Sequence, residues 1–194
     1  MARLPYIDEA DMAPSGEVSG PVLNITRALA NSPGAAKHSL ATAMYIRHRS
    51  PLDPRLRELA ILQVGYCVKN RYEYAHHLKI ALGCGVPEGD IRAIGDETSG
   101  RTGRIDPLAS TVLRAAREMT LDAALSEEIF SALHEELKTE HLVDLLFTIA
   151  NYNSVVRILA SLEVDLEEGY ESYLDRFPLP PDEQSPLRRD LHCR

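Results

Sequence analysis

Apolar side chains recur at helical spacing along most of this chain, and strong turn signals separate the segments. The clearest restart is Ser50-Pro51-Leu52-Asp53-Pro54, where aspartate suits a helix N-cap and proline suits the first helical position. The apolar face of the segment that follows carries Leu56, Leu59, Ala60, Leu62 and Val64. No alternating pattern of a half-buried strand stands out, so the sequence predicts an all-α fold.

The chain has 194 residues, no tryptophan and three phenylalanines, so its core must come mainly from leucine, isoleucine, valine and alanine. We expect an irregular N-terminal arm over 1–20, one helical domain over 21–176 with a linker at about 95–106, and a proline-rich tail over 177–194. The arm or the tail is expected to cross to a neighbouring subunit. Expected helices span about 22–30, 35–47, 54–68, 72–82, 88–94, 107–119, 126–137, 140–162 and 165–175.

The charge balance excludes several classes of partner. The 21 lysines and arginines face 29 aspartates and glutamates, which gives a net charge of −8 and argues against binding to nucleic acid or to an anionic membrane. There is no run of about 18 apolar residues and no apolar signal core, so we expect no spanning helix. The three cysteines lie far apart without a CxxC motif, which fits a reducing compartment. We therefore expect a cytoplasmic protein that acts on a small molecule.

Two parts of the chain resemble each other weakly. Glu58–Tyr66 aligns with Asp144–Tyr152, and Tyr74–Val86 aligns with Tyr152–Val164. The two offsets differ by eight residues, so the first copy contains an extra segment at roughly 67–74. Unrelated amphipathic helices also align this well, and the alignment alone leaves a true internal repeat and a chance likeness open.

The extra segment is rich in reactive side chains. On a helix, Asn70, Glu73 and His77 lie on one stripe, and Glu58 begins an apolar helix that would run antiparallel to it. A carboxylate near an imidazole orients the ring and favours its protonated form, which is the minimum apparatus for moving a proton near neutral pH. The alternative is an ordinary solvated pair of Glu73 and His77 on a helix surface. We expect Glu58 and His77 within hydrogen-bond reach, with Glu73 in the same cavity.

No metal site is expected. Glu73-x-x-His76 is the one Glu-x-x-His in the chain, and a di-iron bundle needs two such motifs with further inward-facing glutamates. A mononuclear site from Glu58, Glu73 and His77 is conceivable but short of histidine. We predict neither a metal nor another cofactor.

The segment LDPRLRELAILQVGYCVKNRYEYAHHLKIALGCGV (52–86) resembles the carboxymuconolactone decarboxylase family, which includes the alkyl hydroperoxidase D group. The stretches LPYIDEADMAP (4–14) and ALANSPGAAKH (28–38) fit as well, and the resemblance covers most of residues 4–165. It implies an all-helical, internally pseudo-symmetric fold that assembles as homo-oligomers, commonly dimers, trimers or hexamers.

The peroxidase branch of that family uses the pattern Glu-x11-Cys-x2-Cys-x3-His. Its glutamate falls on Glu58 and its histidine on His77, but its two cysteines fall on Asn70 and Glu73. A thiol peroxidase needs an attacking thiolate and a resolving thiol, and neither motif thiol is present. Cys67 is either a lone nucleophile or a small buried residue.

The resemblance implies a decarboxylase that acts on a small carboxylated lactone, a keto acid or a similar compound. The residues assign proton delivery to His77, held by Glu58 or Glu73. Substrate-binding candidates are Asn70 toward the enolate oxygen, Lys69 or Arg71 toward the carboxylate, and Tyr72 and His76 as further polar groups. Alkyl hydroperoxidase activity and a non-catalytic oligomeric binding protein remain the alternatives.

Overall fold

The computed structural model describes residues 2–12, 22–101 and 103–181. The described residues form helices without a strand, so the predicted all-α class is confirmed. The elements are the 3-10 helix η1 (Glu9–Asp11) and the α-helices α1 (Asn24–Leu29), α2 (Pro33–His48), α3 (Pro54–Cys67), α4 (Arg71–Gly83), α5 (Glu88–Thr98), α6 (Pro107–Leu121), α7 (Glu127–Glu136), α8 (Thr139–Leu162) and α9 (Glu171–Arg176).

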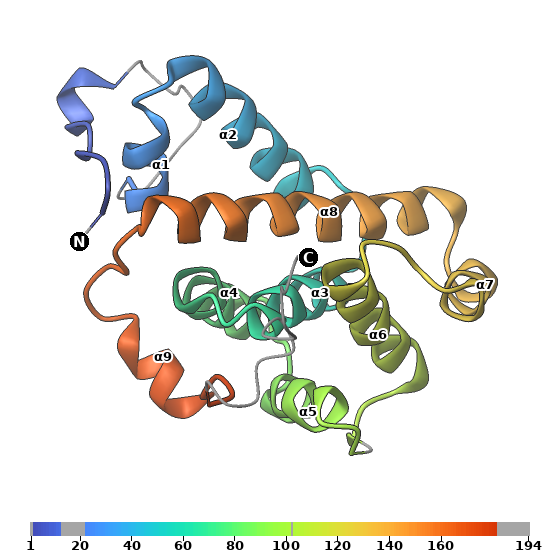
Figure 1. Ribbon diagram of the computed structural model, residues 1–194. Coiled ribbons are helices and arrows are strands. Elements are labelled where there is room, and N and C mark those ends of the chain that lie inside the picture. Colours follow the sequence, from blue (N-terminus) through green and yellow to red (C-terminus); the bar gives the residue numbers. More distant parts are fainter. Residues whose placement is uncertain (1, 13–21, 102, 182–194) are drawn as a thin grey trace, which may run out of the picture.

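Helix α3 forms the centre of the molecule. Asp53 caps it by accepting the backbone N–H groups of Arg55 and Leu56. The helix is buried along almost its whole length and contacts α4, α5, α6 and α8 (Figure 1). An apolar helix at the centre of a bundle is held rigidly by its packing. The backbone of Glu58, which lies on α3, is therefore fixed in position.

Helix α4 turns back against α3. Lys69 adopts a left-handed conformation in the turn (φ 54°), and the Oδ1 of Asn70 then caps α4 by accepting the N–H of Glu73 at 2.9 Å. The helices approach closely at Gly65, where a Cβ would lie 3.4 Å from Tyr74. This close antiparallel packing brings the start of α3 opposite the middle of α4, as the sequence predicted.

Two predicted boundaries differ from the structure. Helix α5 continues to Thr98, inside the linker expected at 95–106, because buried Gln63 hydrogen-bonds Thr98 and holds the last turn. The last helix begins at Glu171 rather than near 165, because Gly169 takes a left-handed conformation (φ 87°) just before it, as Glu163 does at the end of α8 (φ 51°). Asp165 in the connection that follows is hydrogen-bonded by the backbone N–H of Ala2.

Both ends of the chain contact the helical body where the structure describes them. The described part of the arm packs on its own chain, where Tyr6 and Asp165 exchange hydrogen bonds. Phe177, expected in an extended tail, is buried in the core. The rest of the predicted arm (13–20) and tail (182–194) lies outside the described residues.

Helix α8 crosses the molecule, with α1 and α2 on one side and α3 to α6 on the other (Figure 1). By length and composition it could cross a membrane, since its most apolar stretch has a mean hydropathy of 1.3. The rule of an uninterrupted apolar run missed it, because scattered polar residues interrupt the run. Two of its buried polar side chains are hydrogen-bonded within the protein, since Asp144 accepts from Tyr45 and Asn153 donates to Thr120, whereas the hydroxyl of Thr148 has no partner among the described residues. The core helix of a soluble bundle has the same composition.

Helix α2 is the least packed long helix. Ile46 is the one buried residue among its 16, all of which are described. Its last turn is nevertheless fixed, because the hydroxyl of Tyr45 donates to buried Asp144 on α8 at 2.8 Å. Ser50, just after the helix, donates to the same carboxylate at 2.6 Å. The end of α2 is thus held where it approaches α3 and α4.

Candidate functional site

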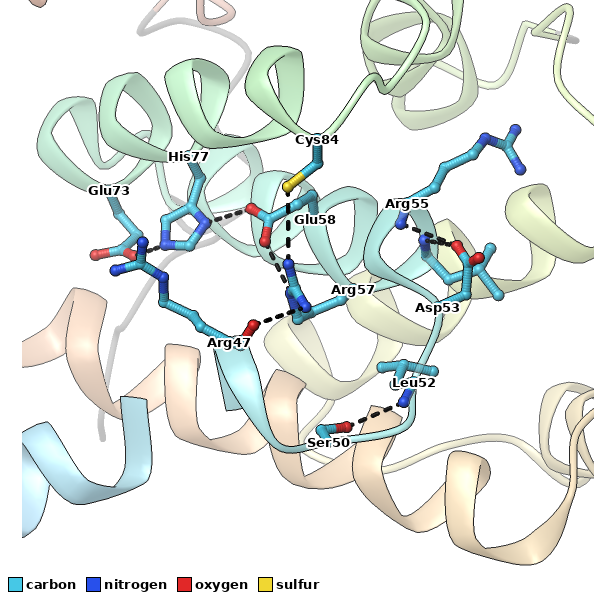
Figure 2. A network of polar contacts seen from close by, with 11 residues as sticks. Arg47, Ser50, Leu52, Asp53, Arg55, Arg57, Glu58, Glu73, His77 and Cys84 are labelled. Atoms are coloured by element: carbon cyan, nitrogen blue, oxygen red, sulfur yellow. Dashed lines mark hydrogen bonds and ion pairs between the residues drawn. The ribbon is translucent and has the colours of Figure 1, made fainter. Parts of the chain in front are cut away.

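The imidazole of His77 lies between two carboxylates (Figure 2). Its Nδ1 is 2.7 Å from Glu58 on α3, and its Nε2 is 3.0 Å from Glu73, one turn earlier on α4. All three side chains are buried, Glu58 completely. The contacts that the sequence predicted among these residues are therefore present.

Arg57 fixes the inner carboxylate. Its Nε donates to Glu58 at 2.9 Å, and its Nη1 donates to the backbone carbonyl of Arg47 at 3.3 Å. Its Nη2 lies 4.0 Å from the sulfur of Cys84. Glu58 therefore has a cation on one oxygen and the imidazole on the other, which leaves it no freedom to approach a substrate.

Burial and charge act in opposite directions on this network. Burial alone would lower the pKa of His77, but Glu58 and Glu73 outweigh it and raise that pKa to about 9. Burial would raise the pKa of Glu58, yet His77 and Arg57 hold it below its ordinary value. At neutral pH the site therefore contains an imidazolium between carboxylates.

Tyr152 on α8 is a site residue that sequence reasoning missed. Its ring lies edge-on to that of His77, with 4.8 Å between the centroids. Burial, and then the charges of Glu73 and Glu58, raise the pKa of its phenol well above 10, so the hydroxyl stays protonated. Among the described residues the hydroxyl has no hydrogen-bond partner. The one signal in the sequence was its position, because Tyr152 ends the second copy of the first aligned segment and begins the second copy of the other.

Three predicted substrate-binding side chains are engaged elsewhere. Asn70 caps α4, and its Nδ2 donates to the carbonyl of Val156 at 3.3 Å. Lys69 donates to the carbonyl of Pro181, and Arg71 is paired with Glu171 at 2.5 Å. Lys69 and Arg71 line a recess of about 360 Å³ beside α9, whose lining does not include His77. Both residues lie at the start of α4, next to α9, and not beside His77.

His76 and Tyr72 form a second cluster. His76 lies 2.6 Å from Glu167 and stacks between the rings of Tyr72 and Tyr170, with centroids at 4.4 and 4.0 Å. Tyr72 donates to Glu167 at 2.8 Å and accepts the N–H of Ile25 at 3.2 Å. The cluster joins α4 to the connection after α8 and to α1, which is a structural arrangement.

Cys67 has no apparatus for nucleophilic attack. The thiol is buried, and burial raises its pKa to about 11 although Gln63 donates to its sulfur at 3.1 Å. A thiol with that pKa carries almost no thiolate at neutral pH. Cys84 is exposed and lies on the other side of the network, against Arg57. Cys193 lies outside the described residues.

Chemically, the site is a short chain of proton carriers. In the described part of the protein, no group of three or more histidine, cysteine, aspartate or glutamate side chains is arranged to hold a metal ion. Glu58, His77 and Glu73 are instead in series, each within hydrogen-bond distance of the next. A proton can pass along such a series without movement of the backbone.

Comparisons with known proteins bear on the family and the fold. Residues 33–100 match the sequence profile of the Carboxymuconolactone decarboxylase family. No curated protein matches the sequence of this chain.

Two solved structures share the fold. One is the debrominase Bmp8, a variant in complex with 2,3,4-tribromopyrrole, with a TM-score of 0.72, 17% identity, and coverage of 81% of this chain and 84% of that one. The other is an uncharacterised peroxidase-related protein from Ralstonia eutropha JMP134, described as an alkylhydroperoxidase AhpD core, with a TM-score of 0.72, 17% identity, and coverage of 89% and 95%. At such identity the likeness shows the fold alone.

The matched residues include Glu58, Glu73 and His77, and the helices around them superpose on AhpD-like structures. Neither cysteine of the peroxidase pattern is present at positions 70 and 73. Over residues 33–100 the chain matches the carboxymuconolactone decarboxylase family, its described residues have an AhpD-like fold, and the CxxC pair is absent at positions 70 and 73.

Proposed function

We propose that this protein is a cofactor-independent acid–base lyase that decarboxylates a small carboxylated lactone, keto acid or similar compound. The observation that carries the proposal is the series Glu58–His77–Glu73, buried and closed by Arg57. Loss of CO2 needs stabilisation of the developing enolate and then its protonation. The site contains proton carriers suited to that task and no thiol pair suited to peroxide.

Within this function, Glu73 exchanges the proton with the substrate. Both ring nitrogens of His77 face carboxylates, so the ring has no free nitrogen to offer. Glu58 is completely buried and held by Arg57. Glu73 uses one oxygen for His77 and keeps the other available. His77 and Glu58 then act behind Glu73, as a proton reservoir and its counter-charge.

The reaction balances with one proton from solvent. The bond between the substrate carbon and its carboxylate breaks, CO2 leaves, and the electron pair passes into the conjugated carbonyl as an enolate. His77 first passes its Nε2 proton to Glu73, and Glu73 then delivers that proton to the carbon. The neutral His77 then takes up a proton from water. Each turnover consumes one proton and needs no oxidant, reductant or metal.

The oxygen of the enolate needs a donor, and Tyr152 fits that role better than Asn70. Asn70 uses its carbonyl oxygen for the helix cap and its NH2 for Val156. The hydroxyl of Tyr152 stays protonated and has no partner among the described residues. A donor without another partner is available to a developing negative charge.

The test is CO2 release from a panel of β-keto acids and carboxylated γ-lactones, followed by ¹³C NMR of the labelled carboxylate. We expect Glu73→Gln to lower kcat by about 10²-fold or more on any substrate that is turned over, the scale of a lost acid–base group. Glu171→Gln, which removes an exposed carboxylate paired with Arg71, is the matched control and should match wild type. Unchanged turnover in the Glu73→Gln protein would refute the assignment. Binding of these acids without any CO2 release would favour a non-catalytic binding protein.

A further inference from the structure

The cations close to the site differ in whether their charge is already used. Arg57 is bound to Glu58, Arg71 is paired with Glu171, and Lys69 donates to Pro181. The guanidinium of Arg47, by contrast, has neither a hydrogen-bond nor an ion-pair partner among the described residues. Its side chain is exposed at the end of α2. Arg47 is therefore a cation whose binding capacity is available to a ligand.

The Arg47 side chain points toward the proton carriers. Figure 2 shows it extending from the end of α2 toward Glu73 and His77. Its charge also acts on the phenol of Tyr152, whose ring is 4.8 Å from that of His77. The carboxylate of Glu73 would repel an anion that approached the site, and an uncommitted cation that extends toward it offsets this repulsion.

The backbone that carries Arg47 is held in place. The residue before it, Ile46, is buried, and the carbonyl of Arg47 accepts a hydrogen bond from Arg57 at 3.3 Å. Tyr45 is bound to Asp144 at 2.8 Å. Arg57 thus binds both the carboxylate of Glu58 and the backbone carbonyl of Arg47. The point from which the Arg47 side chain extends is therefore fixed relative to the proton carriers.

We propose that Arg47 binds the carboxylate of the substrate at the entrance to the Glu73–His77 pair. The inference rests on the proposed function and adds to it the residue that recognises the acid. A guanidinium forms two parallel hydrogen bonds with a carboxylate, which fixes the direction of the bound acid as well as its position. Lys69 and Arg71, the anchors predicted from the sequence, are replaced in this role.

The test compares levulinate with its uncharged methyl ester. Levulinate is a γ-keto acid, so its ketone is not placed to assist loss of CO2 and the acid can be studied by binding alone. Dissociation constants are measured at low ionic strength by ligand-observed NMR on wild type, Arg47→Gln, Arg47→Lys and Arg104→Gln proteins. Arg104 is an exposed arginine in the connection between α5 and α6, so its replacement makes the same change of charge away from the site. Wild type and the Arg104→Gln protein should bind levulinate about tenfold or more tightly than the ester, the scale of a charge-assisted pair.

Arg47→Gln should remove this preference, and Arg47→Lys should keep part of it because the charge remains while the fork is lost. Equal binding of levulinate by wild type and the Arg47→Gln protein, or no preference in wild type, would overturn the proposal. If Arg47→Gln removes binding while no acid is decarboxylated, the anchor stands and the proposed function fails. If an acid is decarboxylated with the same KM after Arg47→Gln, the function stands and the anchor fails.

Discussion

His77 is the residue whose protonation links the stability of the fold to pH. Its pKa in the folded protein is about 9, above the ordinary 6.5. A raised pKa means that the stabilisation is fully present below about pH 6.5 and is lost as the pH rises through about 9. The difference between the two values corresponds to roughly 3 kcal/mol of unfolding free energy.

We therefore expect the midpoint of thermal unfolding to fall between pH 6.5 and 9.5, measured by circular dichroism at constant ionic strength. In a His77→Gln protein the fall over this range should be much smaller. Glu58 acts in the opposite direction, because its lowered pKa adds stability that is lost as the pH falls below its ordinary value. An equal slope in wild type and His77→Gln would show that the imidazole is not an imidazolium in the folded protein.

Replacements at the site should separate acid–base chemistry from thiol chemistry. His77→Ala and Glu58→Gln should each lower activity by about 10²-fold or more, because the first removes the proton reservoir and the second its counter-charge. Cys67→Ser should keep the activity, since burial raises the pKa of this thiol to about 11. Hydroperoxide turnover should be negligible in a lipoyl- or thioredoxin-coupled assay.

The deciding comparison is between two variants in one assay. Loss of activity in Cys67→Ser together with normal activity in His77→Ala would favour the thiol mechanism and refute the acid–base mechanism.

Spacing along the chain predicted the contacts of His77 with Glu58 and Glu73 and could not have predicted the other side chains around them. Glu58 and His77 were predictable because both lie on the inner faces of helices, where helical period determines direction. Asn70 lies on the same stripe, but its position just before α4 assigns its side chain to capping. Tyr152 and Arg47 come from α8 and α2, and no local pattern reports which distant helix packs nearby.

At the scale of elements, the cap of α4 supports the site directly. Asn70→Ala should destabilise the protein by about 1 kcal/mol, the usual cost of a lost N-cap, and lower Tm by roughly 2–4 °C. Activity should fall as well, because Glu73 and His77 lie in the turns that this cap holds. Asn70→Asp, which keeps the accepting oxygen, should recover most of the stability. Thermal unfolding and kcat measured on both variants check this, and an unchanged Tm in Asn70→Ala would contradict it.

Element boundaries were predictable where a cap and an apolar face agree, as at Asp53 before α3 and Asp106 before α6. They were not predictable where a tertiary contact decides. Glycine, serine and charge made 95–106 resemble a linker, yet Gln63 from α3 holds Thr98 in the last turn of α5. The extension of α5 depends on a partner 35 residues away.

At the scale of the whole molecule, several large apolar side chains of α7 and α8 are exposed in one chain. Val143 and Phe147 on α8 are 58% and 46% exposed, and Phe130 on α7 is 40% exposed. Tyr45 of the loosely packed α2 lies edge-on to Phe147, at 6.2 Å between centroids. Such surfaces mark sites of association. We propose that copies of this chain cover them in a homo-oligomer.

Light scattering at micromolar concentration should then give a mass of at least two chains. Phe147→Asp should shift the protein toward the monomer, because a charge on this surface loses its solvent on association. Ser99→Asp, at the exposed end of α5, should not change the mass. A monomeric mass for wild type would contradict the proposal.

The uneven attachment of α2 has a consequence for motion. Its last turn is tied to α3 and α8 through Arg57 and Asp144, whereas its earlier turns bury no residue. Segments with few buried contacts open locally far more often than the whole protein unfolds. We therefore expect α2 to unfold locally from Pro33 onward and to stay helical at Tyr45, which is bound to Asp144 and precedes the buried Ile46. Opening of the early turns therefore leaves the backbone of Arg47 in place, because its carbonyl stays bound to Arg57.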